Sequence, residues 1–234
     1  MKFFTEEWYH DTLISQMCFS IRKSNRAQAL SDKFFEKLYS SESEWYAKHL
    51  KRAAKFNHTA FDKEAAKAEF DKNYEDNLEF VKTLPDEILS EIADIRVFAL
   101  GTVSYKVADN LTSYCGKLNR KCQTIQEKYD DSLESVAQII GWTPINMLNM
   151  ISESEIVSAD SENSAAIIKT SECKITLGGC NGSNCLVGAR IIAFELTTSD
   201  ENKKLCLGLL LEDAEGKLFD ESLYFDSISV EEIG

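Results

Sequence analysis

The chain has 234 residues, of which 44% are hydrophobic, so it can bury a core and is not a wholly disordered protein. Its formal net charge is −13, and residues 151–234 carry most of it, with 6 basic and 16 acidic side chains and a net charge of −10. Nucleic acids and anionic lipids are bound through Lys and Arg. The charge therefore argues against nucleic acid and membrane as partners and permits a basic partner protein.

The first residues, MKFFTEEWYHDTL, contain no long apolar run and reach Glu6 and Glu7 at once, so we expect no signal peptide. No window approaches the ~20 apolar residues that cross a bilayer. Seven cysteines, an odd number without a secretion signal, fit reduced thiols better than a disulfide framework. We therefore expect a cytoplasmic protein.

Apolar residues recur every three or four positions from Thr5 to about Ala137, which predicts an α-helical region. The expected helices begin after Thr5, run over 27–38, begin again at a capping box of Ser41 and Glu44, run from Thr59 or Asp62 to about Val81, and follow Pro85.

One long helix is expected at about 104–136, with Ser104 as its cap. Its apolar positions follow a near-heptad pattern through Leu111, Cys115, Leu118, Cys122, Ile125, Tyr129 and Val136. About thirty residues of helix reach ~45 Å. Such a helix suits the spine of a bundle or a dimer seam, and the other amphipathic helices of the chain favour the spine.

The pattern then changes from helical to extended. Residues 151–164 are polar and lack a cap, which predicts a linker. Strands are expected at 165–170, 173–177, 189–197, 204–211 and 222–230, with turns at 198–202 and 213–216. The prediction is an α+β chain, with an α-helical domain at 1–150, the linker at 151–164, and a small, acidic, antiparallel β domain at 165–234.

Two groups of side chains suggest core or site. The aromatic residues of the helical region have helical spacing, and we expect most of them to be core rather than a ligand site: Phe3, Phe4, Trp8, Tyr9, Phe34, Phe35, Trp45 and Tyr46. Arg96 is a lone charge among apolar neighbours and needs an anionic partner. That partner is either a local acid, Asp94 or Glu91, or the carboxylate or phosphate of a ligand bound between the domains.

The stretch GGCNGSNC, residues 178–185, predicts a hairpin because Asn-Gly tolerates the positive φ of a type I′ turn. If Gly182-Ser183 forms the tip instead, Cys180 and Cys185 face each other as a thiol pair. Cys173, Cys180, Cys185 and Cys206 are weak candidates for a zinc site, since their spacings lack the usual close pairs. No phosphate-binding glycine motif is present, and we predict no cofactor and no catalytic residue.

Several segments resemble an uncharacterised family, domain of unknown function 4085, found mostly in Firmicutes. They are MKFFTEEWY at 1–9, FFEKLY at 34–39 with Trp45, FDKEAAKAEF at 61–70 and, most specifically, LPDEILSEIADIRVFALG at 84–101. The resemblance covers most of residues 1–130. Members often carry His-Asp-Cys before a basic and an apolar residue, whereas this chain has Ser171-Glu172-Cys173-Lys174-Ile175 and lacks the histidine. The resemblance implies no activity, cofactor or site residue.

Three hypotheses about function follow. The first is a non-enzymatic interaction protein, of accessory or immunity type, that binds a basic partner. The second is a small-molecule binder or enzyme with an inter-domain site near Arg96. The third is a scaffold stabilised by zinc.

Overall fold

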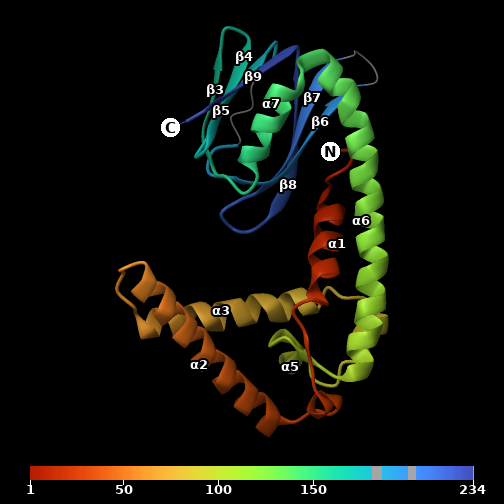
Figure 1. Ribbon diagram of the computed structural model, residues 1–234, viewed down its shortest axis with the longest axis vertical. Coiled ribbons are helices and arrows are strands. Elements are labelled where there is room, and N and C mark those ends of the chain that lie inside the picture. The colour runs from red at the N-terminus through yellow and green to blue at the C-terminus, as the bar shows by residue number, and fades with distance from the viewer. Residues whose placement is uncertain (181–185, 200–203, 234) are drawn as a thin grey trace. The chain divides into compact units, whose positions relative to one another are not determined.

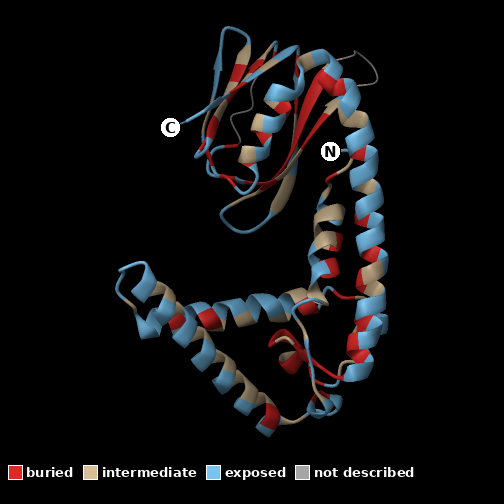
Figure 2. Cartoon of the chain, in the orientation of Figure 1, coloured by how far each residue is buried: buried red, intermediate tan, exposed pale blue. Residues whose placement is uncertain are grey.

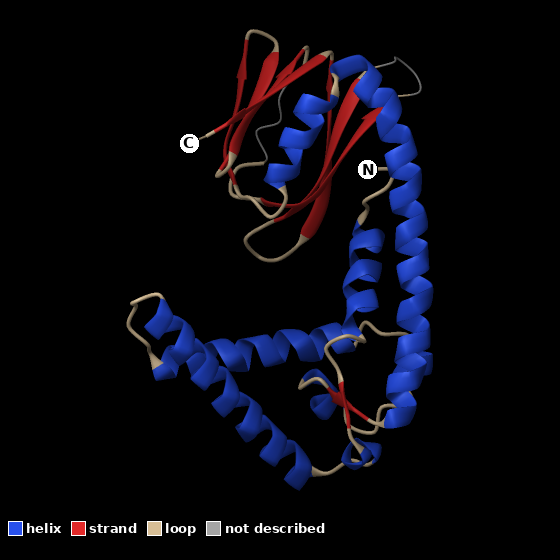
Figure 3. Ribbon diagram, in the orientation of Figure 1, coloured by secondary structure: helices blue, strands red, loops and turns tan. Residues whose placement is uncertain are grey.

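A computed structural model describes residues 1–180, 186–199 and 204–233 and confirms the α+β class, with helices first and antiparallel sheets after them (Figures 1 and 3). The chain forms two compact units, one of residues 13–118 and one of residues 1–12 with 119–234. We call them the helical unit and the mixed unit. The division departs from the predicted boundary at 150, because Val136 and Ala137 pack into the core of the strands. In the described ranges, no helix has the length and apolar character that a membrane span requires.

The N-terminal elements are α1 (Glu6–Met17), β1 (Arg22–Lys23), η1 (Asn25–Gln28), α2 (Asp32–Phe56), α3 (Lys63–Val81), α4 (Asp86–Leu89), α5 (Ile95–Ala99), β2 (Thr102–Val103) and α6 (Tyr105–Ile140). The predicted long helix is confirmed as α6, and α1 and α6 each contribute residues to both units. The Ser104 hydroxyl accepts a hydrogen bond from the Val107 N–H at 3.2 Å, which confirms the predicted cap.

Helix α2 replaces two predicted helices. Ser31 caps it by accepting from the Phe34 N–H, and Ser41 lies in its interior, so the predicted capping box at Ser41 is wrong. No Gly or Pro occurs between Ser31 and Asn57, and nothing in the backbone chemistry ends the helix earlier. Asp62 caps α3 by accepting hydrogen bonds from two backbone N–H groups. Of the two predicted starts of this helix, Thr59 and Asp62, the second is therefore confirmed.

After α7 (Trp142–Leu148) and η2 (Asn149–Ile151) come β3 (Ile156–Glu162), β4 (Ala165–Thr170), β5 (Cys173–Gly178), β6 (Arg190–Thr198), β7 (Leu205–Glu212), β8 (Leu218–Phe225) and β9 (Ser227–Glu232). They form a four-stranded sheet in the order β3-β4-β5-β9 and a three-stranded sheet in the order β6-β7-β8, and every neighbouring pair is antiparallel. The predicted strand at 222–230 is two strands that belong to different sheets.

The predicted linker at 151–164 is wrong. Ile151 and Ile156 are fully buried, and β3 pairs with β4 through a two-residue turn in which Asn163 and Ser164 both have positive φ. A type I′ hairpin turn requires that conformation at both positions. The polar side chains of β3 lie on a strand at the edge of the sheet, where exposure of most residues is tolerated.

The stretch 178–185 does not join neighbouring strands. β5 ends at Gly178 in one sheet and β6 begins at Arg190 in the other, so the chain passes from sheet to sheet here. Residues 181–185, and with them the proposed turn and the Cys180–Cys185 pair, lie outside the described residues. Most of the predicted turn at 198–202 does so as well, whereas the turn at 213–216 is confirmed, with Gly216 at φ +80°.

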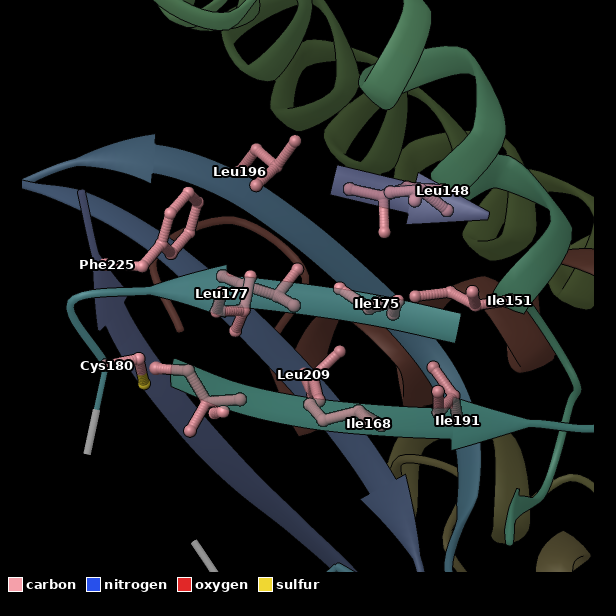
Figure 4. Packing of buried hydrophobic residues seen from close by; sticks show 14 of the residues in the cluster. Leu148, Ile151, Ile168, Ile175, Leu177, Cys180, Ile191, Leu196, Leu209 and Phe225 are labelled. Atoms are coloured by element: carbon pink, nitrogen blue, oxygen red, sulfur yellow. The ribbon is translucent and has the colours of Figure 1, made fainter. Parts of the chain in front are cut away.

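Both sheets and α7 contribute to one hydrophobic core in the mixed unit (Figure 4). Leu177 of β5, Leu209 of β7 and Phe225 of β8 are fully buried there. Alternate residues of β7 point away from this core. Both faces of β7 are buried, since seven of the eight residues of the strand are buried. A separate core in the helical unit centres on Val107, Leu111 and Cys115 of α6.

Candidate binding groove

The helical unit contains a groove of about 670 Å³ whose walls are α2, α3 and the turn after α5. We call it the α2/α3 groove. Its lining is Met17, Ser20, Ile21, Arg22, Ser41, Glu42, Trp45, Tyr46, Phe70, Asn73, Tyr74, Asn77, Phe80, Val81, Phe98, Ala99, Leu100 and Gly101. Most of these side chains are apolar or aromatic. Both helices are largely exposed or half-buried along their length (Figure 2), so the groove opens on a surface rather than into a core.

A ladder of aromatic rings holds the two helices together beside the groove. Tyr39 of α2 makes edge-to-face contacts with Phe70 and Tyr74 of α3, at centroid distances of 5.2 and 5.1 Å. Tyr46 packs on Phe70 at 5.8 Å and Phe35 on Tyr74 at 6.1 Å. Such pairs stabilise the helix contact beyond the area they bury. The groove wall is therefore preformed.

Hydrogen bonds from the tyrosine hydroxyls fix the rim. Tyr46 donates to Glu69 Oε1 at 2.9 Å and accepts from the Asn73 amide at 3.2 Å. Tyr39 donates to Asp71 Oδ1 at 2.6 Å, and burial together with that carboxylate raises the pKa of Tyr39 well above its ordinary value. A raised pKa keeps each hydroxyl protonated as a donor. These tyrosines orient the groove rather than titrate in it.

An ion pair lies in the lining of the groove. Arg22 Nη1 lies 2.7 Å from Glu42 Oε1, and Arg22 Nη2 donates to the Leu100 carbonyl at 2.9 Å. Arg22 and Glu42 are the charged members of the lining, and each neutralises the other. The remaining polar lining consists of amides and hydroxyls, with Asn73, Asn77 and Ser41 exposed. The groove can therefore pack apolar side chains and offer neutral hydrogen bonds.

Trp45 is an exception to the expectation that most aromatic residues of the helical region are core. It is 61% exposed, although Phe4 and Phe34 from the same set are buried. Its indole stacks on the His49 imidazole, with centroids 5.5 Å apart and an interplanar angle of 16°. An exposed large aromatic ring beside a groove is typical of an interaction surface.

Arg96 has a local anionic partner, the first of the two alternatives predicted for it. Its guanidinium donates two hydrogen bonds of 2.9 Å to Asp94, one to each carboxylate oxygen, and a third to Asp32. It also lies over the Phe35 ring at 4.7 Å. Burial alone would raise the pKa of the Asp94 carboxyl, but the hydrogen bonds and charge of Arg96 outweigh burial and lower it. Arg96 therefore anchors α5 and does not face the α2/α3 groove.

The cysteines predicted as weak zinc ligands are buried apolar groups where the structure describes them. Cys173 and Cys180 belong to the core of the mixed unit, Cys206 is 8% exposed, and burial raises the pKa of all three thiols. Within 1–180, 186–199 and 204–233, no three His, Cys, Asp or Glu side chains are placed to hold a metal ion together. Cys185 lies outside these ranges.

A second hollow, of about 440 Å³, lies in the mixed unit between α6, α7 and β6. Phe4, Trp8, Tyr129 and Trp142 line it. The Trp8 Nε1 is buried without a hydrogen-bond partner among the described residues. Because that nitrogen is inaccessible, it does not present a donor to a ligand, and the hollow is smaller than the α2/α3 groove.

The residues that follow Trp45 along α2 carry a sequence signal for a surface. From Trp45 to Phe61 the chain has four Lys or Arg and no Asp or Glu. Trp45, His49, Arg52 and Phe56 follow at steps of four, three and four, which places them on one helix face. Aromatic and cationic residues alternating on one face indicate a surface rather than a core.

The comparisons with known proteins place the chain in no group: no family model matches it, and neither a curated protein nor a solved structure is significantly similar. The resemblance to domain of unknown function 4085 stays a prediction.

Proposed function

We propose that the protein is a non-enzymatic interaction protein that binds a segment of a partner polypeptide in the α2/α3 groove. The observation that carries the proposal is a preformed aromatic groove with an exposed tryptophan at its mouth. Tryptophan and tyrosine are enriched among residues that dominate binding energy at interfaces. A cytoplasmic location and membership of domain of unknown function 4085 belong to the same proposal.

The lining supports a polypeptide segment as the bound group. Helix α2 lines the groove over residues 41–46 and α3 over residues 70–81, and apart from the Arg22–Glu42 pair the polar lining consists of amides and hydroxyls. Helix-in-groove recognition uses such surfaces, with apolar anchors inserted at helical spacing. The ion pairs of Arg96 with Asp94 and Asp32 give no support to a ligand site at that residue.

Site-specific photocrosslinking tests the proposal. A benzophenone amino acid replaces Trp45 or Asn77 at the groove, or Lys72 on the exposed far face of α3, in cells that naturally make the protein. We expect both groove positions, and not Lys72, to crosslink to the same protein. The purified partner should bind one to one, and Trp45→Ala should weaken that binding at least tenfold without lowering the thermal midpoint. Absence of a groove-specific adduct would refute the proposal.

A second surface supports the predicted basic partner. In residues 151–234, Arg190 pairs with Glu153 and Glu212, while Lys174 pairs with Glu231 and Lys204 with Asp226. Among the described residues of this region, these pairs involve four carboxylates, and the acidic side chains there outnumber the basic ones. A basic partner should therefore bind the mixed unit with a strong salt dependence. Binding that is unchanged between 50 and 300 mM salt would contradict this second candidate.

A further inference from the structure

An exposed row of side chains continues from the mouth of the α2/α3 groove along α2. Trp45 is 61% and Phe56 86% exposed, and His49 and Arg52 lie between them on the same face. We call these four residues the α2 stripe. From Trp45 to Phe56 a helix advances about 16 Å, which corresponds to eleven helical or about five extended residues of a partner.

The surroundings of the α2 stripe are positive. Lys48, Lys51 and Lys55 are exposed beside Arg52, and no acid follows Glu44 until Asp62. Glu44 itself pairs with Lys48 at 3.5 Å, with both side chains about two-thirds exposed, so the pair is weak. Lys48 and Lys55 stand three and ten positions after Trp45 and therefore flank the stripe on the side of Arg52.

The neighbouring helix has the opposite charge. α3 holds six acidic and three basic side chains, with Glu69 and Asp76 on its exposed surface. The exposed side chains around the α2/α3 groove are thus mainly positive on the α2 side and mainly negative on the α3 side. An extended anionic surface, such as a bilayer or a nucleic acid, would meet both sides at once and be repelled by α3. A narrow segment along α2 meets the positive side alone.

We propose that the segment bound by the groove is acidic and amphipathic. Its apolar side chains pack in the α2/α3 groove and on Trp45 and Phe56, and its carboxylates pair with Lys48, Arg52 and Lys55. This inference rests on the proposed function and adds the chemical class of the partner and its direction along α2. The acids of α3 disfavour the reverse placement, in which the partner's carboxylates would lie beside Glu69 and Asp76.

Two measurements on the full chain test the partner class. The first maps the partner residues crosslinked from Trp45 and Asn77, where we expect a stretch with net negative charge and apolar residues at helical spacing. The second compares a fluorescent Leu- and Glu-containing amphipathic 15-residue peptide with its twin that has Lys for every Glu. We expect the acidic peptide to bind about tenfold more tightly at low salt.

Matched charge reversals assign the effect to Arg52 of the α2 stripe and to the two lysines that flank the stripe. The triple variant Lys48→Glu, Arg52→Glu and Lys55→Glu should bind the acidic peptide about tenfold more weakly than the wild type does, and it should prefer the basic twin. Each exposed ion pair contributes up to about fivefold to the affinity. The control Lys33→Glu, Lys37→Glu and Lys72→Glu changes the net charge equally at exposed positions outside the stripe and should change binding less than twofold.

Four results would overturn the inference. The first is equal binding of the two peptides, and the second is a loss of acidic-peptide binding in the control variant as large as that in the triple variant. The third is that vesicles of phosphatidylserine and phosphatidylcholine sediment with the wild type but not with the triple variant, and the fourth is that the wild type self-associates and the triple variant does not. A groove adduct that maps to a basic or uncharged segment would refute the partner class while leaving the proposed function intact. No adduct at all would instead refute the proposed function.

Discussion

Glu195 is a buried carboxylate whose removal should destabilise the mixed unit. It is 3% exposed and accepts three backbone hydrogen bonds, from the N–H groups of Lys2, Phe3 and Phe4, at 2.6, 2.8 and 3.2 Å. Together they fix residues 2–4 against β6, and Phe4 is buried as a result, with its ring 4.6 Å from that of Tyr129.

The substitution Glu195→Gln preserves the shape of the side chain and removes its charge. The amide oxygen can keep two of the three bonds, those from Phe3 and Phe4, but its NH₂ group then faces the Lys2 N–H. Hydrogen bonds to charged groups contribute about 1.5–3 kcal/mol each and neutral ones about 1, and relief of burying a charge offsets part of the loss. We expect the free energy of unfolding to fall by about 2 kcal/mol.

Urea denaturation followed by tryptophan fluorescence measures this change. Trp8 packs on Phe4 at 4.7 Å, so its emission reports whether residues 2–4 stay bound. For a chain of this size, about 2 kcal/mol corresponds to a fall in the thermal midpoint of about 4–8 °C. Glu232→Gln, at an exposed position of β9, is the control and should lie within about 0.5 kcal/mol of the wild type. A Glu195→Gln protein as stable as this control would refute the reasoning.

Three further substitutions test local structure. Asp94→Asn should cost about 2 kcal/mol at pH 7. Because Arg96 lowers the folded-state pKa of Asp94, that stabilisation is fully present above the unfolded pKa near 3.8 and is lost as the pH falls through the lower folded value. The difference in unfolding free energy between variant and wild type should therefore shrink progressively as the pH falls below 3.8. Asp62→Ala removes the cap of α3 and should lower the free energy of unfolding by about 1 kcal/mol, whereas Asp62→Asn should stay close to the wild type. Thermal melts followed by circular dichroism measure both variants. Gly179→Ala should cost about 2 kcal/mol, since Gly179 has φ +75° and a Cβ would overlap the Asp226 carboxylate; an unchanged urea midpoint would contradict this.

The sequence was sufficient for elements whose chemistry is local. Ser104 and Asp62 cap helices because an oxygen two or three residues before free N–H groups needs no distant partner. The alternation in β4 and β5 identified strands because one face is buried, and every second residue of each is inaccessible or nearly so. The acidity of residues 151–234 could likewise be read directly from composition.

Errors arose where partners far apart in the chain decide the structure. β3 looks like a linker because its exposed edge is polar, and only its pairing with β4 makes it a strand. The stretch at 178–185 suggests a hairpin because its glycines and asparagines suit a turn. The strands on either side of it, β5 and β6, belong to different sheets, and residues 181–185 themselves lie outside the described residues. The boundary at 150 failed because Val136 and Ala137 are buried by strands that follow them.

The α2/α3 groove shows the same division. The residues of α2 already displayed their spacing and positive charge, so the amphipathic stripe follows from the sequence alone. Whether Trp45 is core or surface depends on how far α3 covers α2. That coverage is fixed by the contacts of Tyr39 with Phe70 and Tyr74, which lie more than 30 residues further along the chain. Local chemistry determined which residues are helical and charged; only tertiary packing decided which of them remain available to a partner.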